Sequence, residues 1–131
     1  MIQRLHAYPA AALLCLALAA GGAHAADAAD PFDCNPNGNQ QEINACAVRD
    51  FHTSDAKLNN RYREVMAALP TDKRMALRQE QREWIKHRDP GCKAQAKPNE
   101  GGSIWPLEFY GCLQKITDQR VTALNNWEGR R

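Results

Sequence analysis

The sequence of 131 residues has no hydrophobic run long enough to cross a membrane, and it has no strong excess of charge. Its longest apolar run, AAALLCLALAA at residues 10–20, is far shorter than the roughly 20 residues that a spanning helix needs. The 17 basic and 15 acidic residues leave a formal net charge of +2. Proteins that bind nucleic acid usually carry a strongly basic face. We therefore expect neither a membrane span nor a nucleic-acid partner.

Catalytic motifs and closely spaced metal ligands are also missing from the sequence. Of the four histidines, only His52 and His87 follow the N-terminal segment, and they do not form an i, i+4 pair on one helix. No serine stands in a recognisable motif with a histidine and an aspartate. A metal-dependent enzyme built on the two histidines stays as an alternative. The preferred interpretation is two exposed helix histidines in a protein that is no enzyme and has no metal or cofactor.

The first 25 residues have the pattern of a secretory signal peptide. Arg4 precedes the apolar run, and residues 23–25 (AHA) form a cleavage signal of the A-x-A type. Cys15 lies inside the apolar run, but Leu14 occupies the place where a lipoprotein signal has a small residue. We predict cleavage after residue 25 and export to the periplasm or the medium without a lipid anchor. Removing 25 of the 131 residues leaves 106, enough for one small domain at residues 26–131.

Four cysteines remain in the predicted exported domain, and they are widely spaced. They are Cys34, Cys46, Cys92 and Cys112. Zinc sites usually contain close pairs such as C-x-x-C, which these cysteines do not form. An even number of cysteines in an exported domain predicts disulfides. The pairing stays open, since four cysteines allow three pairings, although pairings between different helices are favoured.

Apolar residues recur at helical spacing in three segments, which predicts an all-α fold without strands. The helices are expected at about residues 39–69, 72–89 and 103–127. A short joint at Pro70 makes the first two helices an antiparallel hairpin, and the third helix runs back alongside. The sequence therefore predicts a small disulfide-stabilised three-helix domain built on a long antiparallel helical hairpin.

Capping residues and prolines set the expected ends of these helices. Asn39 and Glu42 form a capping box at the first helix, and Ser103 is the expected N-cap of the third. Pro90 is expected to end the second helix, because the residue before a proline resists the helical conformation. Residues 90–102 are then a loop rich in proline and glycine. Loops of this length tend to be functional or mobile.

The polar residues around QREWIKHRDPGC (81–92) could form an active site or could hold the helices together. We prefer a structural network, because buried polar groups must be paired. The proposed members are Gln81, Arg82, Arg88, Asp89 and Arg120. Arg88 can bind a carboxylate through two hydrogen bonds, and Asp55 is a candidate partner. Met75, Trp84 and Ile85 lie at helical spacing, with Trp84 and Ile85 expected to point inward; Tyr62 and Trp127 are also expected in the core.

Several stretches of the sequence together resemble a known family. They are NQQEINACA (39–47), DAKLNNRY (55–62), QREWIKHRDPGC (81–92), EGGS (100–103), Cys112 and ITDQRVTAL (116–124). In this combination the chain resembles the LprI-type lysozyme-inhibitor family, also called YecT-like, of small secreted bacterial proteins. The resemblance implies an all-helical, disulfide-stabilised exported domain that inhibits a lysozyme. The chain departs from the family at His87, where an aromatic residue is usual, and in having no cysteine suited to lipid attachment.

The predicted loop and its flanks supply residues that could bind such a partner. Retaining lysozymes act with two carboxylates in an open cleft, which a loop with cations and hydroxyls could enter. The candidate binding residues are Lys93, Lys97, Gly101, Gly102, Ser103 and Trp105. Trp105 could instead cover the cysteines. The alternative function is a structural or stress-related envelope module that binds another protein or a component of the cell wall.

Overall fold

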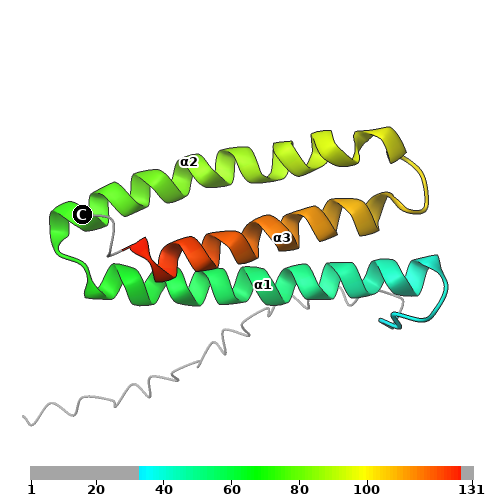
Figure 1. Ribbon diagram of the computed structural model, residues 1–131, viewed down its shortest axis with the longest axis horizontal. Helices are drawn as coiled ribbons and strands as arrows, with labels where there is room; N and C mark the ends of the chain where they lie inside the picture. Colours follow the sequence, from blue (N-terminus) through cyan, green and yellow to red (C-terminus); the bar gives the residue numbers. More distant parts are fainter. Residues whose placement is uncertain (1–32, 128–131) are drawn as a thin grey trace, which may run out of the picture.

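The computed structural model describes residues 33–127, so the predicted signal peptide lies outside the described residues. Within this range the chain forms α1 (Gln40–Ala68), α2 (Thr71–Ala96), the 3₁₀ helix η1 (Lys97–Asn99) and α3 (Trp105–Asn125). Residues 33–127 contain no strand, and none of their helices is long and apolar enough to cross a membrane. The predicted all-α, three-helix class is confirmed (Figure 1).

The three helices are unequally packed. α1 and α2 run in opposite directions, and α3 runs back between them along α1 (Figure 1). α3 packs extensively on α1 and more sparsely on α2, while α1 and α2 make little direct backbone contact. Side chains of α2 therefore reach the rest of the bundle mainly through α3, and much of the surface of α2 is left exposed.

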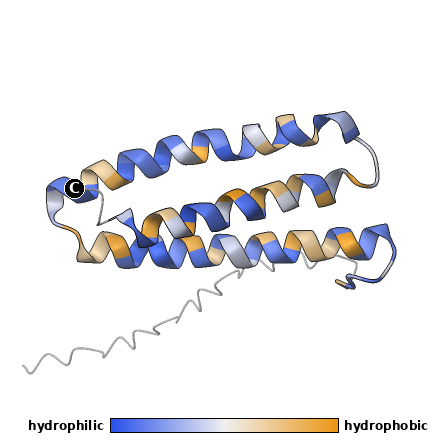
Figure 2. Cartoon of the chain, in the orientation of Figure 1, coloured by the Kyte–Doolittle hydropathy of each residue, from blue (hydrophilic) through white to orange (hydrophobic). Residues whose placement is uncertain are grey.

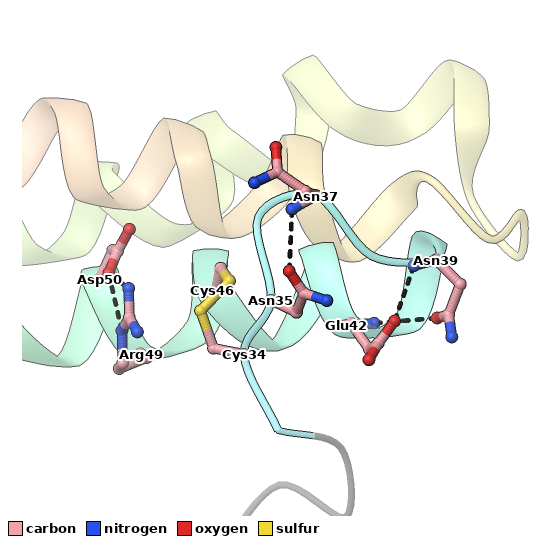
Figure 3. The surroundings of a disulfide bond; sticks show 8 residues. All are labelled: Cys34, Asn35, Asn37, Asn39, Glu42, Cys46, Arg49 and Asp50. Carbon is pink, nitrogen blue, oxygen red and sulfur yellow. Dashed lines mark hydrogen bonds and ion pairs between the residues drawn. A yellow bond between two sulfur atoms is a disulfide. The ribbon is translucent and has the colours of Figure 1, made fainter.

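The start of α1 has the capping box that the sequence predicts. Asn39 Oδ1 accepts hydrogen bonds from the backbone N–H groups of Gln41 and Glu42 at 2.9 and 3.1 Å. In return, the Glu42 carboxylate accepts from the backbone N–H of Asn39 at 2.7 Å (Figure 3). These contacts satisfy backbone donors that the first turn of a helix leaves unpaired.

Two apolar clusters form the core at different heights of the bundle. The cluster nearer the α1–α2 connection contains Leu58, Val65, Leu69, Leu77 and Leu124. Tyr62, Trp84 and Trp127 pack around it and are half-buried, as their positions on apolar faces predict. The other cluster contains Phe51, Cys92, Cys112 and Leu113.

The two disulfides join Cys34 to Cys46 and Cys92 to Cys112. The first ties the segment before α1 to the second turn of that helix (Figure 3). The second joins α2 to α3 and is buried in the core. The disulfide-stabilised class is thereby confirmed, and the pairing that the sequence left open is resolved. The favoured link between different helices holds for Cys92–Cys112 but is wrong for Cys34–Cys46, because Cys34 precedes α1.

The predicted end of the second helix before Pro90 is wrong. α2 continues to Ala96, with Pro90 inside it, and η1 follows directly. A proline in a helix removes one backbone hydrogen bond and crowds the preceding turn. Cys92 and Ala96, both buried, hold the last turns of α2 against the bundle. The predicted 90–102 loop is therefore mostly helical, and only the turn at residues 100–104 connects η1 to α3.

Two further expectations about side chains also fail. α3 begins at Trp105 with Ile104 at its N-cap, so Ser103 is not the cap. Ile85 is 49% exposed and Met75 is 62% exposed, so neither points into the core. The buried positions of α2 are Leu77, Gln81, Cys92 and Ala96. This narrow stripe is what a helix presents when it packs mainly against one neighbour.

Candidate functional site

Arg120 of α3 is at the centre of a buried polar contact with α2. Its Nε donates to Gln81 Oε1 at 2.8 Å, and its Nη1 donates to Glu80 Oε1 at 2.6 Å. The other oxygen of Glu80 accepts from the indole Nε1 of Trp127 at 2.9 Å. The guanidinium also lies 5.7 Å from the centre of the Trp84 ring. Arg120 thus joins α3 to α2 through both charge and aromatic contacts.

Arg88 of α2 makes the corresponding contact with α1. Its Nη1 donates to Asp55 Oδ1 at 2.8 Å, and its Nε donates to Asp89 Oδ1 at 2.7 Å. The guanidinium lies 5.3 Å from the ring centres of both Phe51 and Trp84. Trp84 therefore contacts two arginines, and the Arg88–Asp55 pair links α2 to α1, two helices with little direct backbone contact.

The charge on Arg88 is secured by its partners. Burial alone would lower the pKa of the guanidinium, but the hydrogen bonds to Asp89 and Asp55 outweigh it and raise the pKa above its ordinary value. Arg88 therefore stays protonated wherever the fold persists. Arg82, the remaining arginine of the predicted network, is exposed and joins none of these contacts within residues 33–127.

Replacing Arg88 with glutamine is expected to lower the free energy of unfolding by about 1–2 kcal/mol, because two charge-assisted hydrogen bonds and two cation–π contacts are lost. Urea denaturation followed by circular dichroism measures this change. Arg82→Gln on the same helix is the matched control and should stay within about 0.5 kcal/mol of wild type. Equal effects of the two substitutions would contradict a structural role for the Arg88 contacts.

Within residues 33–127, the histidines and acidic residues are not grouped as ligands of a metal ion. His52 and His87 are both exposed. Among residues 33–127, no three histidine, cysteine, aspartate or glutamate residues are placed to hold one metal ion. The carboxylates of Asp55, Asp89 and Glu80 instead bind arginines or an indole N–H. Glu80, Gln81 and Arg88 of α2 are thus used to join helices.

The turn at residues 100–104 is the second candidate site, and several contacts hold it. Gly101 has a φ of +81°, which glycine adopts readily, and the backbone N–H of Gly102 donates to the Asn99 carbonyl at 2.9 Å. The Asn99 side chain donates to both carboxylate oxygens of Glu108 in α3 at 2.9 and 3.0 Å. From α1, Asn44 Nδ2 donates to the Ser103 carbonyl at 2.8 Å.

The structure places most of the predicted binding residues on the surface around this turn. Lys93 is exposed in the last turn of α2, and Lys97 is exposed at the start of η1. Gly101, Gly102 and Ser103 are exposed in the turn itself. Together they form one end of the bundle, at the right of Figure 1, where η1 and the turn project beyond the start of α3.

Trp105 differs from the other predicted binding residues because it is half-buried. Its ring stacks on Phe109 with centroids 4.8 Å apart and planes 12° apart. Phe109 packs in turn on the cluster that contains Cys92 and Cys112. Trp105 is thus linked to the disulfide cluster through Phe109. The exposed apolar residue at this end is Ile104, which the sequence reasoning did not select, because one isoleucine before a helix carries no distinctive pattern.

The fold and this end of the molecule define a class: small, disulfide-stabilised all-α proteins that present a braced turn on a helical scaffold. The family described as "Lysozyme inhibitor LprI" matches residues 33–124, which include all three helices except the end of α3. The chain belongs to this family, as the sequence resemblance predicts. Because the family is one of non-catalytic inhibitors, membership fits a protein that is no enzyme and that has a protein partner.

One curated relative matches with confidence. It is an uncharacterized protein of Rhizobium meliloti (strain 1021), 36% identical over 105 aligned residues, and the match covers 70% of this chain and 76% of the relative. No solved structure matches. The two disulfides and the family fit an extracellular or periplasmic protein.

Proposed function

We propose that this protein is exported and inhibits a lysozyme, using the 100–104 turn and the lysines beside it to bind the enzyme's cleft. The observation that carries the proposal is the family match, which spans residues 33–124 and so includes the whole turn and its supports. The signal-peptide pattern of residues 1–25 and the disulfides support export.

The chemistry of the turn suits a cleft that contains carboxylates. Retaining lysozymes cleave glycans with two carboxyl groups in an open cleft. Lys93 and Lys97 are exposed, and within residues 33–127 neither side chain takes part in a hydrogen bond or an ion pair. Ser103 adds an exposed hydroxyl, and Ile104 adds an exposed apolar side chain. Cationic and apolar groups are thus presented together.

The turn is also held in shape before any partner arrives. Asn44 ties it to α1, the Asn99–Glu108 contact ties η1 to α3, and the Cys92–Cys112 disulfide joins the two helices that flank it. A binding segment that is already ordered loses less conformational entropy when it binds. Bracing by three helices therefore favours recognition by the turn.

Replacing Lys97 with glutamate should weaken inhibition, because a negative charge would face the carboxylates of the cleft. Purified protein is titrated into a retaining lysozyme that is digesting bacterial cell walls, and the concentration for half-inhibition is measured. We expect the wild type to slow digestion and Lys97→Glu to raise this concentration about tenfold, as expected for a like-charge contact at an interface.

Lys73→Glu is the matched control, since Lys73 is exposed near the opposite end of α2 and the change in charge is the same. It should inhibit like wild type. Unchanged digestion at a large molar excess of wild-type protein would overturn the proposed function. A pull-down from periplasmic extract that returned one stoichiometric partner other than lysozyme would then favour the alternative, an envelope module with another protein partner.

A further inference from the structure

Basic side chains follow the exposed side of α2. With 100° of rotation per residue, Arg78, Arg82, Lys86 and Lys93 fall within an arc of about 80°. We call these four residues the basic row. All four are exposed, and they extend along most of α2 (Thr71–Ala96). The whole of α2, with its 26 residues, is about 39 Å long.

The positive charge of the basic row is largely uncompensated. Lys86 pairs with Glu83 at 2.7 Å, but within residues 33–127 the side chains of Arg78, Arg82 and Lys93 take part in no hydrogen bond, ion pair or ring contact. The one acidic residue on the same arc, Asp89, is bound by Arg88 at 2.7 Å. The near-zero net charge of the whole chain therefore conceals a locally basic helix face.

Two large apolar side chains share this side of the helix. Met75 and Ile85 are 62% and 49% exposed, and by helical rotation both fall in or beside the arc of the basic row. Figure 2 shows α2 as a mostly hydrophilic helix with few hydrophobic residues on it. Basic residues interleaved with exposed apolar ones are typical of helices that lie on a membrane surface.

We infer that the outer face of α2 binds the surface of a membrane that contains anionic phospholipids, with the helix lying in the plane of the headgroups. The basic row would contact headgroup phosphates, and Met75 and Ile85 would enter the apolar boundary just below them. A soluble polyanion would satisfy the charges but would offer nothing to the two apolar side chains. The inference does not rest on the proposed inhibition, although Lys93, at the end of the basic row, also lies beside the turn at residues 100–104.

The test measures sedimentation of the purified exported chain with two kinds of vesicle. One kind is phosphatidylcholine alone, and the other contains about one third phosphatidylglycerol. We expect binding to the anionic vesicles only, and weaker binding as salt is raised from about 50 mM to 500 mM. The Arg78→Gln/Arg82→Gln double variant should partition about 25-fold less, since each basic residue near such a surface contributes about fivefold.

Lys57→Gln/Lys115→Gln is the matched control, because it removes two exposed charges from α1 and α3 instead. It should bind the anionic vesicles nearly as wild type does. Met75→Ser/Ile85→Ser keeps every charge and should still weaken vesicle binding, which a purely electrostatic contact with a polyanion would not show. Binding to neutral vesicles of equal strength, an equal loss in the control, or no effect of the serine variant would each overturn the inference.

The lysozyme titration separates this inference from the proposed function. Arg78→Gln/Arg82→Gln should inhibit lysozyme like wild type, since neither arginine is in the turn or beside it. Failure of the wild type to inhibit lysozyme would leave the vesicle result unaffected. Failure to bind vesicles would equally leave the inhibition intact.

Discussion

Replacing Leu58 with alanine is expected to lower the free energy of unfolding by about 2–5 kcal/mol. Leu58 is 2% exposed and belongs to the larger apolar cluster, where it joins Val65, Leu77 and Leu124. The truncation removes buried methyl groups and leaves a cavity between three helices that cannot easily close. Because small domains are stable by only about 5–15 kcal/mol, the loss is a large share of the total. Urea denaturation followed by circular dichroism measures it.

Ile85→Ala is the informative control for this experiment. It removes a similar volume of aliphatic side chain from α2, but from a residue that is 49% exposed. The free energy of unfolding should change by no more than about 0.5 kcal/mol, because the side chain is largely exposed to water in the folded protein. A loss as large as that of Leu58→Ala would show that Ile85 packs inward, as helical spacing alone predicts.

The fold could be predicted well where local signals and tertiary packing agree. α1 is the clearest case, since its capping box at Asn39 and its apolar spacing through Leu58 and Val65 match the structure. α1 packs on α3 over most of its length, so the residues that recur at helical spacing are also those that are buried. The apolar periodicity of α1 therefore predicts its buried face correctly.

α2 shows why the rest could not be predicted. Periodicity indicates which residues share a face, but it does not say how wide a stripe will be buried. Because α2 packs mainly on α3, the stripe is narrow, and Met75 and Ile85 are left outside it. The expectation that α2 ends before Pro90 fails for a related reason. Cys92 is buried and bonded to α3, and this tertiary contact keeps the residues after the proline helical.

The candidate site was only partly foreseeable. Asp55 could be named as a partner for Arg88, because an antiparallel hairpin places the middle of α1 beside the later turns of α2. The two residues do pair, at 2.8 Å. Glu80 was missed as the partner of Arg120, since its carboxylate next to Gln81 has no distinctive sequence context. The supports of the 100–104 turn are amide side chains such as Asn44, whose partner is a backbone carbonyl far along the chain.

Removing the Cys92–Cys112 disulfide by the double substitution Cys92→Ala/Cys112→Ala is expected to lower the free energy of unfolding by about 3 kcal/mol. The cross-link spans 20 residues, and its loss returns conformational freedom to the unfolded chain. Both sulfurs also leave the core cluster around Phe51 and Leu113, which adds a loss of packing. Urea denaturation measures the change in stability. The lysozyme titration, done where the variant is folded, measures the effect on the turn, and we expect the variant to inhibit lysozyme more weakly than wild type.

Cys34→Ala/Cys46→Ala is the matched control, because it removes a cross-link of comparable size, with a separation of 12 residues. Its entropic cost should also be about 3 kcal/mol, but it neither opens the core cluster nor releases α2 from α3. Inhibition should therefore persist in this variant. If the Cys92→Ala/Cys112→Ala protein, assayed where it is folded, inhibited as strongly as wild type, the Asn44 and Asn99 side chains would suffice to hold the turn. The buried disulfide would then act on stability alone.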